Sequence, residues 1–265
     1  MSRSLCRATR AAAGALALAG ALVPAAAASA GDRYVALGDS YSSGTGTRTY
    51  VDASCQRSIR AYPALLAADR PGTTLVHRAC AGATTSDVLR DQVSSLTTGT
   101  RLVSITVGGN DAGFAAVLKE CAKPAWASDC AGAVEDARRS IRGTLPARLD
   151  RVYGQIAARA PAARVAVLGY PRVFNGEDCN AVTFFSPDDE RRLNATADLL
   201  RDVLRERAQA HGFRFGDVVP DFVGHAVCDR VEWLNGASTP LSESFHPNVA
   251  GHRDGYLPVV RRLLG

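Results

Sequence analysis

The sequence of residues 31–265 predicts an α/β fold, a three-layer α/β/α sandwich with a central, mostly parallel, five-stranded sheet. Short, largely apolar runs alternate with longer amphipathic segments along these residues. Strands covered by helices on both faces have this continuous apolar character, and alternation of strand with helix is typical of a parallel sheet. No segment has the composition of a linker, so we expect a single domain.

The five predicted strands are four to six residues long. Each is followed by turn residues and then by a segment with helical spacing, which returns the chain to the start of the sheet. This arrangement predicts a doubly wound sheet. The strands are expected at residues 34–37, 75–79, 102–107, 165–168 and 213–218.

Residues 187–210 carry the clearest helix signals. Ser186 can cap the first turn, Pro187 fits the first helical position, and the acids that follow suit the positive end of the helix dipole. His211 and Gly212 then mark the end of this helix. Hydrophobic spacing predicts further helices at residues 85–96, 131–160 and 249–264.

Residues 1–30 have the pattern of a secretory signal peptide. A basic, acid-free start precedes an apolar stretch rich in Ala and Gly, and the segment ends in A-S-A at residues 28–30. A transmembrane anchor is the alternative, but Pro24 interrupts the apolar stretch, and no later segment is apolar enough to span a bilayer. We therefore expect cleavage after Ala30 and a secreted, extracellular protein with no stable insertion into membranes.

The charge of the chain argues against nucleic acid as a partner. The net charge is +5, but three of the 31 basic residues lie in the predicted signal peptide, which leaves 28 basic against 26 acidic side chains. These side chains are interspersed without a basic run, so their long-range attraction for phosphate backbones is weak.

Six cysteines follow the predicted signal peptide. In an exported protein an even number indicates disulfides. Zinc ligation and free buried thiols are the alternatives, but no C-x-x-C pair and no histidine at ligand spacing support a zinc site. Many pairings are possible, and the order in the chain favours local ones: Cys55 with Cys80, Cys121 with Cys130, and Cys179 with Cys228.

Three short motifs lie at predicted strand ends or helix starts. Ser40 lies in G-D-S after the first strand, Asn110 in G-G-N-D after the third strand, and His246 in S-F-H-P-N before the last helix. Ligands bind at the carboxyl edge of open α/β sheets, where serine, histidine and an amide suit a nucleophile, a general base and an oxyanion donor. Taken alone, each motif is explained as readily by an ordinary turn.

Together, the motifs resemble those of the SGNH (GDSL) hydrolases. GDSYSSG near the mature N-terminus, GGND after the third strand and SFHPN near the C-terminus have that family's order and spacing. The sequence lacks G-x-S-x-G, the nucleophile elbow of the α/β-hydrolases. With its six cysteines and the form VALGDSYSSG, the chain looks like the family's secreted bacterial esterases and lipases, which implies a flavodoxin-like sheet.

The resemblance implies a serine carboxylic ester hydrolase. Ser40 would be the nucleophile and His246 the general base, and the backbone N–H groups of Ser40 and Gly82 would form the oxyanion hole with the side chain of Asn110. Fatty-acyl esters, as small molecules or lipids, are the implied substrates. Acetylated carbohydrates and a non-catalytic secreted binding domain are the alternatives. No cofactor or metal is implied, a monomer is expected, and an unperturbed histidine base would lose activity below about pH 6.5.

The residue that orients the histidine departs from the family pattern. The family's usual aspartate, three residues before the histidine, is Glu243 here. The longer side chain would overshoot the ring from the same backbone position, whereas the main-chain carbonyl of Ser244 would not. Both remain candidates; we favour the carbonyl, with Glu243 then a solvated loop acid paired with an arginine.

Overall fold

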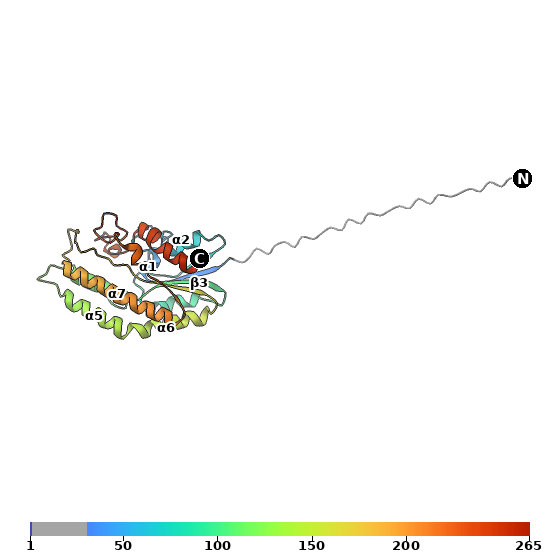
Figure 1. Ribbon diagram of the computed structural model, residues 1–265, viewed down its shortest axis with the longest axis horizontal. Helices are drawn as coiled ribbons and strands as arrows, with labels where there is room; N and C mark the ends of the chain where they lie inside the picture. Colours follow the sequence, from blue (N-terminus) through green and yellow to red (C-terminus); the bar gives the residue numbers. More distant parts are fainter. Residues whose placement is uncertain (2–30) are drawn as a thin grey trace. The chain divides into compact units, whose positions relative to one another are not determined.

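A five-stranded parallel sheet with the strand order β2-β1-β3-β4-β5 forms the centre of the chain in the computed structural model (Figure 1). The structure describes Met1 and residues 31–265, and the predicted signal peptide lies outside the described residues. All five predicted strands are confirmed, and the sheet is parallel throughout. The strands are β1 (Arg33–Gly38), β2 (Thr74–His77), β3 (Thr100–Thr106), β4 (Arg164–Leu168) and β5 (Arg214–Gly216).

Helices cover both faces of this sheet, as the apolar strands require. In β1, Tyr34 and Ala36 belong to one core cluster, whereas Val35 and Leu37 belong to the other. Successive side chains of a strand point to opposite faces, so both faces of β1 are buried. The longer helices lie together on one side of the sheet: α5 (Cys130–Gly143), α6 (Leu145–Arg159) and α7 (Pro187–Ala210) (Figure 1). On the other side, α2 (Tyr62–Ala68) lies with the C-terminal helix α8 (Leu257–Leu264).

The helices differ from the sequence-based prediction in where they break. The expected helix at 131–160 is two helices that meet at Thr144, because Pro146 lacks the N–H that a continuing helix needs. Three helices, α1, α2 and α4, were not predicted. The helices are α1 (Ser40–Ser43), α2 (Tyr62–Ala68), α3 (Thr85–Asp87), α4 (Phe114–Cys121), α5 (Cys130–Gly143), α6 (Leu145–Arg159), α7 (Pro187–Ala210) and α8 (Leu257–Leu264).

Two further predicted helices are only partly α-helical. The segment predicted at 85–96 begins as α3 but continues as a π-helical turn, Val88–Gln92, and a 3₁₀ turn, Val93–Ser95. The segment at 249–264 begins with the π-helical turn Gly251–Tyr256 before α8. Hydrophobic spacing does not distinguish these tighter or wider turns from an α-helix, and π turns occur often near functional sites.

Helix α7 begins where the sequence predicted. The Ser186 side chain accepts the N–H of Asp189, and the Asp189 carboxylate accepts the N–H of Ser186. This reciprocal capping box satisfies two backbone donors that a helix start leaves without partners. It fixes the direction of the longest helix in the described residues.

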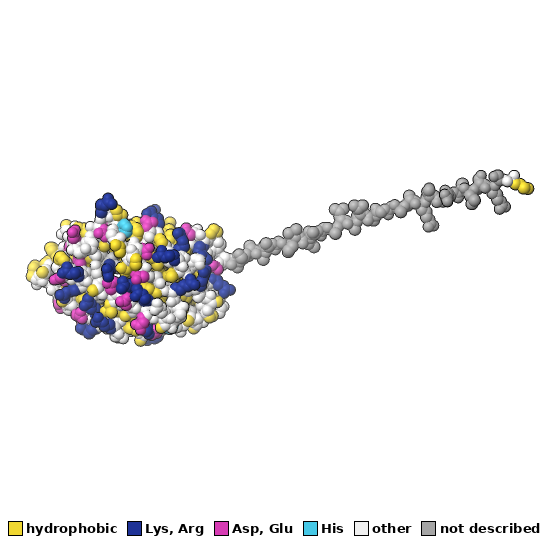
Figure 2. All heavy atoms as spheres, viewed as in Figure 1, with side chains coloured by type: hydrophobic (Ala, Val, Ile, Leu, Met, Phe, Trp, Pro, Cys, Tyr) yellow, Lys and Arg dark blue, Asp and Glu magenta, His cyan; other side chains and the backbone are white. Residues whose placement is uncertain are grey.

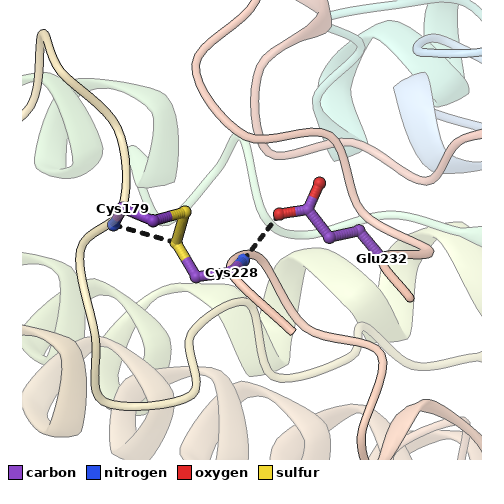
Figure 3. Close-up of side chains that lie close together, drawn as sticks. All are labelled: Cys179, Cys228 and Glu232. Carbon is purple, nitrogen blue, oxygen red and sulfur yellow. Dashed lines mark hydrogen bonds between the residues drawn. A yellow bond between two sulfur atoms is a disulfide. The ribbon is translucent and has the colours of Figure 1, made fainter. Parts of the chain in front are cut away.

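The three predicted disulfides are confirmed: Cys55–Cys80, Cys121–Cys130 and Cys179–Cys228. Glu232 lies beside the third of these (Figure 3), where its carboxylate accepts the N–H of Cys228 at 2.7 Å. Because the two sulfurs are bonded to each other, this cluster offers no thiolate to a metal ion.

Charges of both signs are mixed over the surface that Figure 2 shows. Several arginines pair with a carboxylate three residues away on the same helix, as Arg139 does with Asp136 and Arg191 with Asp188. Exposed pairs of this kind stabilise a helix only slightly. Within residues 31–265, no helix has the length and apolar character needed to cross a membrane.

The disulfides are expected to differ in what they contribute to stability. Cys179 and Cys228 are 49 residues apart and Cys121 and Cys130 are nine apart. In the chain-entropy model the longer loop contributes about 4 kcal/mol and the shorter about 3 kcal/mol, both upper estimates. Urea unfolding of Cys179→Ser/Cys228→Ser should therefore show the larger loss in unfolding free energy. Cys121→Ser/Cys130→Ser is the matched control, and a larger loss there would contradict the prediction.

Candidate active site

Ser40 lies at the carboxyl edge of the sheet, where β1 passes directly into α1. The turn depends on Gly38, whose φ is +120° and whose Cβ, if present, would lie 2.2 Å from the carbonyl oxygen of Thr106. Only glycine fits this position without moving β3. The side chain of Gln92 accepts the N–H of Gly38 at 2.8 Å and donates to its carbonyl oxygen at 2.9 Å.

Asp39 caps the short helix that Ser40 begins. One carboxylate oxygen of Asp39 accepts the N–H of Tyr41 at 3.0 Å, and the N–H of Asp39 donates to the carbonyl of Thr106 on β3. The Asp39 side chain is buried, and this desolvation raises its pKa to about 7, although hydrogen bonds from Tyr170 and Tyr41 act in the opposite direction. The turn that carries Ser40 is therefore held by both β1 and β3.

His246 meets Ser40 from the opposite end of the chain. Its Nε2 lies 2.8 Å from Ser40 Oγ, and its Nδ1 lies 2.8 Å from the main-chain oxygen of Ser244. A carbonyl oxygen only accepts, so Nδ1 carries the proton of the neutral ring. Nε2 is then left with its lone pair toward the serine hydroxyl, which is the arrangement that general-base catalysis requires.

The surroundings of His246 favour its neutral form. The ring is partly exposed at a cavity wall, but most of its environment is protein, and this desolvation lowers its pKa from 6.5 to about 4. The hydrogen bond to Ser244 and the charge of Glu243 raise the pKa and offset only part of that effect. The expectation of an unperturbed histidine is therefore wrong for this site.

Glu243 does not face the histidine. Tyr50 donates its hydroxyl to one carboxylate oxygen at 2.7 Å, and Arg48 donates Nε–H to the other at 3.1 Å. The residue is 3% exposed, so the expectation of a solvated acid is wrong, whereas pairing with an arginine is confirmed. Glu243 thus ties the loop that carries Ser244 and His246 to the segment around Tyr50.

Asn110 and Gly82 lie on two neighbouring turns. One N–H of the Asn110 amide donates to the carbonyl of Ala83 at 3.0 Å, which leaves its second N–H available. Gly82 has a φ of +79°. Among the hydrogen bonds within residues 31–265, neither the N–H of Gly82 nor that of Ser40 donates to a protein acceptor. Asn110 lines the same cavity as Ser40, and Gly82 is not among the residues that line it.

Two tyrosines that were not predicted as site residues, Tyr41 and Tyr170, lie next to Ser40 and His246. Tyr41 donates its hydroxyl to the carbonyl of Phe245 at 2.6 Å, which links the turn that carries Ser40 to the loop that carries His246. Its ring lies 5.2 Å from that of His246 and 5.0 Å, edge-on, from that of Tyr170. Tyr41 was detectable as the neighbour of Ser40 in the motif, whereas nothing around Tyr170 in the sequence indicates its place.

A largely apolar cavity of about 590 Å³ opens beside Ser40 and His246. Helix α4 supplies one wall, and the loops after β4 and before His246 supply others. A cavity of this size and character suits an apolar chain better than a sugar. Its apolar lining includes Phe114, Leu118, Val173, Val182, Leu200 and Leu241.

The parallel sheet and the Ser40–His246 contact at its carboxyl edge have the arrangement of a serine hydrolase. A family comparison then identifies the particular family: the model of the GDSL-like Lipase/Acylhydrolase family matches residues 36–253. The chain belongs to this family, which confirms the resemblance seen in the motifs.

Three Streptomyces proteins are closely similar. The chain is 44% identical over 253 residues to "Lipase 1" of Streptomyces coelicolor, which covers 94% of this chain and 93% of that protein. The fold of this chain matches that of the extracellular lipase of Streptomyces rimosus, with a TM-score of 0.83 and 47% identity; the match covers 88% of this chain and 99% of that lipase. It also matches phospholipase A1 of Streptomyces albidoflavus NA297 (TM-score 0.83, 43% identity, 88% and 100% coverage).

Because the pKa of His246 is lowered, we predict how kcat/KM should depend on pH. A base that stays neutral down to about pH 4 should support an almost constant kcat/KM from pH 6.5 to 5, followed by a fall as the pH approaches 4. Steady-state hydrolysis of a p-nitrophenyl ester, with the product quantified after alkaline quenching, measures this profile. A half-maximal point near 6.5 would show that the ring is not desolvated in solution.

Acid unfolding is the control for this profile. Burial also lowers the pKa of His77 to about 4 and that of His252 to about 3. Below pH 6.5 these histidines therefore bind more protons in the unfolded chain than in the folded one. Their contribution makes the free energy of unfolding fall as the pH falls toward 4. Asp39, with its raised pKa, opposes this trend between about pH 7 and 3.8. Circular dichroism at each pH separates unfolding from titration of the base.

Proposed function

We propose that this protein is a secreted lipase or esterase that cleaves fatty-acyl esters through an acyl-enzyme on Ser40. The observation that carries the proposal is the 2.8 Å contact between Ser40 Oγ and His246 Nε2 beside an apolar cavity. The apolar lining favours fatty-acyl chains over the acetylated carbohydrates considered as an alternative. The similar Streptomyces proteins are a lipase and a phospholipase A1, which supports a fatty-acyl ester as the substrate.

In the first half of the reaction, Ser40 Oγ attacks the acyl carbonyl carbon while its proton moves to Nε2 of His246. The carbonyl oxygen becomes negative and lies among the N–H groups of Ser40 and Gly82 and the amide of Asn110. When the intermediate collapses, the C–O bond to the alcohol breaks and the imidazolium returns the proton to the leaving oxygen. The acyl group is then bound to Ser40.

In the second half, water takes the place of the alcohol. His246 removes a proton from the water as it attacks the acyl carbon, the same N–H groups stabilise the second oxyanion, and Ser40 leaves as the proton returns to its oxygen. The products are a carboxylic acid and the regenerated enzyme. Every group that moves a proton in this cycle belongs to Ser40 or His246.

The orienting group in this scheme is the carbonyl of Ser244. It holds Nδ1–H and thus selects the tautomer, as a carboxylate would. Unlike a carboxylate, it carries no full charge to stabilise the imidazolium, so more of the rate enhancement rests on the oxyanion hole. This division of roles agrees with a carboxylate of Glu243 that is already bonded to Tyr50 and Arg48.

The proposed function includes export from the cell and activity as a monomer. A signal peptide at residues 1–30, removed after Ala30, would deliver residues 31–265 to an oxidising compartment. Three disulfides support this route, because such bonds persist mainly outside the cytosol. All the residues assigned to the reaction come from one chain, so a monomer suffices for activity.

Ser40→Ala should lower kcat by about 10³-fold or more, because the oxyanion hole alone retains only a small part of the catalysis. The assay is hydrolysis of p-nitrophenyl esters from acetate to decanoate, in which the parent protein should prefer the longer chains. An organophosphonate should inactivate the parent and label Ser40, as located by peptide mass spectrometry. Ser43→Ala, a buried serine on the same short helix, is the matched control and should still be labelled. Label on any other residue, or a preference for acetate, would contradict the proposal.

Glu243→Gln tests the orienting group separately. Since Glu243 contacts Tyr50 and Arg48 rather than the imidazole, we expect kcat to fall by less than about tenfold. A loss near 10⁴-fold, the scale seen when a triad acid is neutralised, would instead establish Glu243 as the third member of a triad. The melting temperature is measured in parallel, because removing the charge that pairs with Arg48 weakens the attachment of the loop without contacting the ring.

A further inference from the structure

Tyr170 joins the two turns on which the proposed reaction depends. It lies two residues beyond the end of β4, and its hydroxyl donates to Asp39 Oδ2 at 2.5 Å. The hydroxyl oxygen of Tyr170 also accepts the N–H of Gly109 at 3.1 Å. Asp39 immediately precedes the proposed nucleophile, and Gly109 immediately precedes Asn110. The hydroxyl oxygen of Tyr170 therefore bridges the turn that carries Ser40 and the turn that carries Asn110.

The strand order explains how a residue after β4 reaches both turns. β3 lies between β1 and β4 in the sheet, so the chain beyond β4 comes next to the turn after β3 and one strand away from the turn after β1. The long side chain of Tyr170 spans that distance over Gly109. A Cβ added at Gly109 would lie 3.3 Å from the Tyr170 ring, which shows how closely the turn and the ring pack.

All the partners in this bridge are buried. Asp39 is 1% exposed and Tyr170 is 8% exposed. Buried polar groups left without partners are costly, so the bridge has one favoured geometry rather than many. Tyr41 packs edge-on against the Tyr170 ring at 5.0 Å and limits the rotation of that ring.

We propose that Tyr170 is a positioning residue that sets the distance between Ser40 and the Asn110 amide, and thereby aligns the oxyanion hole with the attacked carbonyl. This rests on the proposed roles of Ser40 and Asn110. A bound ester carbonyl carries little charge and gains little from the alignment, whereas the tetrahedral oxyanion gains much. Tyr170 therefore acts on kcat through Asn110 and leaves substrate binding nearly unchanged.

Tyr170→Phe deletes the bridging oxygen and keeps the ring. With p-nitrophenyl octanoate we expect kcat to fall about 10- to 100-fold while KM changes by less than about threefold, as for an interaction made in the transition state. Tyr153→Phe is the matched control: Tyr153 is a fully buried tyrosine of α6 whose hydroxyl has no hydrogen-bond partner in the described residues. Its kcat should stay within about twofold of the parent.

The deciding measurement is a double-mutant cycle with Asn110→Ala. Once the amide that Tyr170 aligns is gone, adding Tyr170→Phe should lower kcat by less than about threefold. An undiminished 10- to 100-fold loss in that background would overturn the proposal, because Tyr170 would then act independently of Asn110. A kcat of Tyr170→Phe within threefold of the parent would overturn it as well.

Asp39→Asn provides a second route should Tyr170→Phe fail to fold. The amide keeps the size of the carboxylate and one acceptor oxygen, so it weakens the bridge from its other end. Its kcat should also fall, and the fall should also shrink in the Asn110→Ala background; additive losses would contradict the proposal. Ser40→Ala separates the two hypotheses: an active Ser40→Ala removes the proposed function, whereas an inactive one with additive Tyr170 effects removes only this inference.

Discussion

The hydrogen bond between Ser40 Oγ and His246 Nε2 is the contact on which the rest of the site depends. It joins residues 206 positions apart in the chain, so neither residue can be placed by local structure alone. The sheet places Ser40, because β1 ends at Gly38 and the chain passes through Asp39 directly into the short helix that Ser40 begins. His246 is placed by the loop before it, which Tyr41 holds through the carbonyl of Phe245 and Glu243 holds through Arg48 and Tyr50.

The strand order explains why the site forms between the first and third strands. The chain leaves β1 toward β2 on one side and returns to place β3 on the other, so the turns after β1 and β3 diverge and leave a crevice. Ser40 and Asn110 occupy these two turns and line one cavity. The glycine at position 38 lets the first turn approach Thr106 of β3 closely, which brings the two turns together.

Much of this could be predicted from the sequence, because the signals are local. Apolar runs identified all five strands, and the order of the cysteines gave the disulfide pairs. The break between α5 and α6 was missed, although Pro146 marks it, because the hydrophobic spacing continues across the break. The burial of Glu243 and the position of Tyr170 could not be predicted, since each depends on partners such as Tyr50 and Asp39 that are distant in the chain.

The group that accepts the hydrogen bond from His246 Nδ1 is a main-chain carbonyl and not a carboxylate, and this affects how the charged form of the ring is stabilised. A carbonyl there orients the ring but does not stabilise its charged form, and burial makes that form still less favourable. In the proposed mechanism the oxyanion hole must therefore supply more of the stabilisation of the transition state, and such stabilisation depends on donors held in place beforehand. Buried hydrogen bonds hold the turns that carry Ser40 and Asn110. In the first, the Gln92 side chain bonds both the N–H and the carbonyl of Gly38; in the second, the Asp111 carboxylate accepts both the N–H and the hydroxyl of Thr85. Under the proposed mechanism, donors held in this way would offset the absence of a carboxylate beside the histidine.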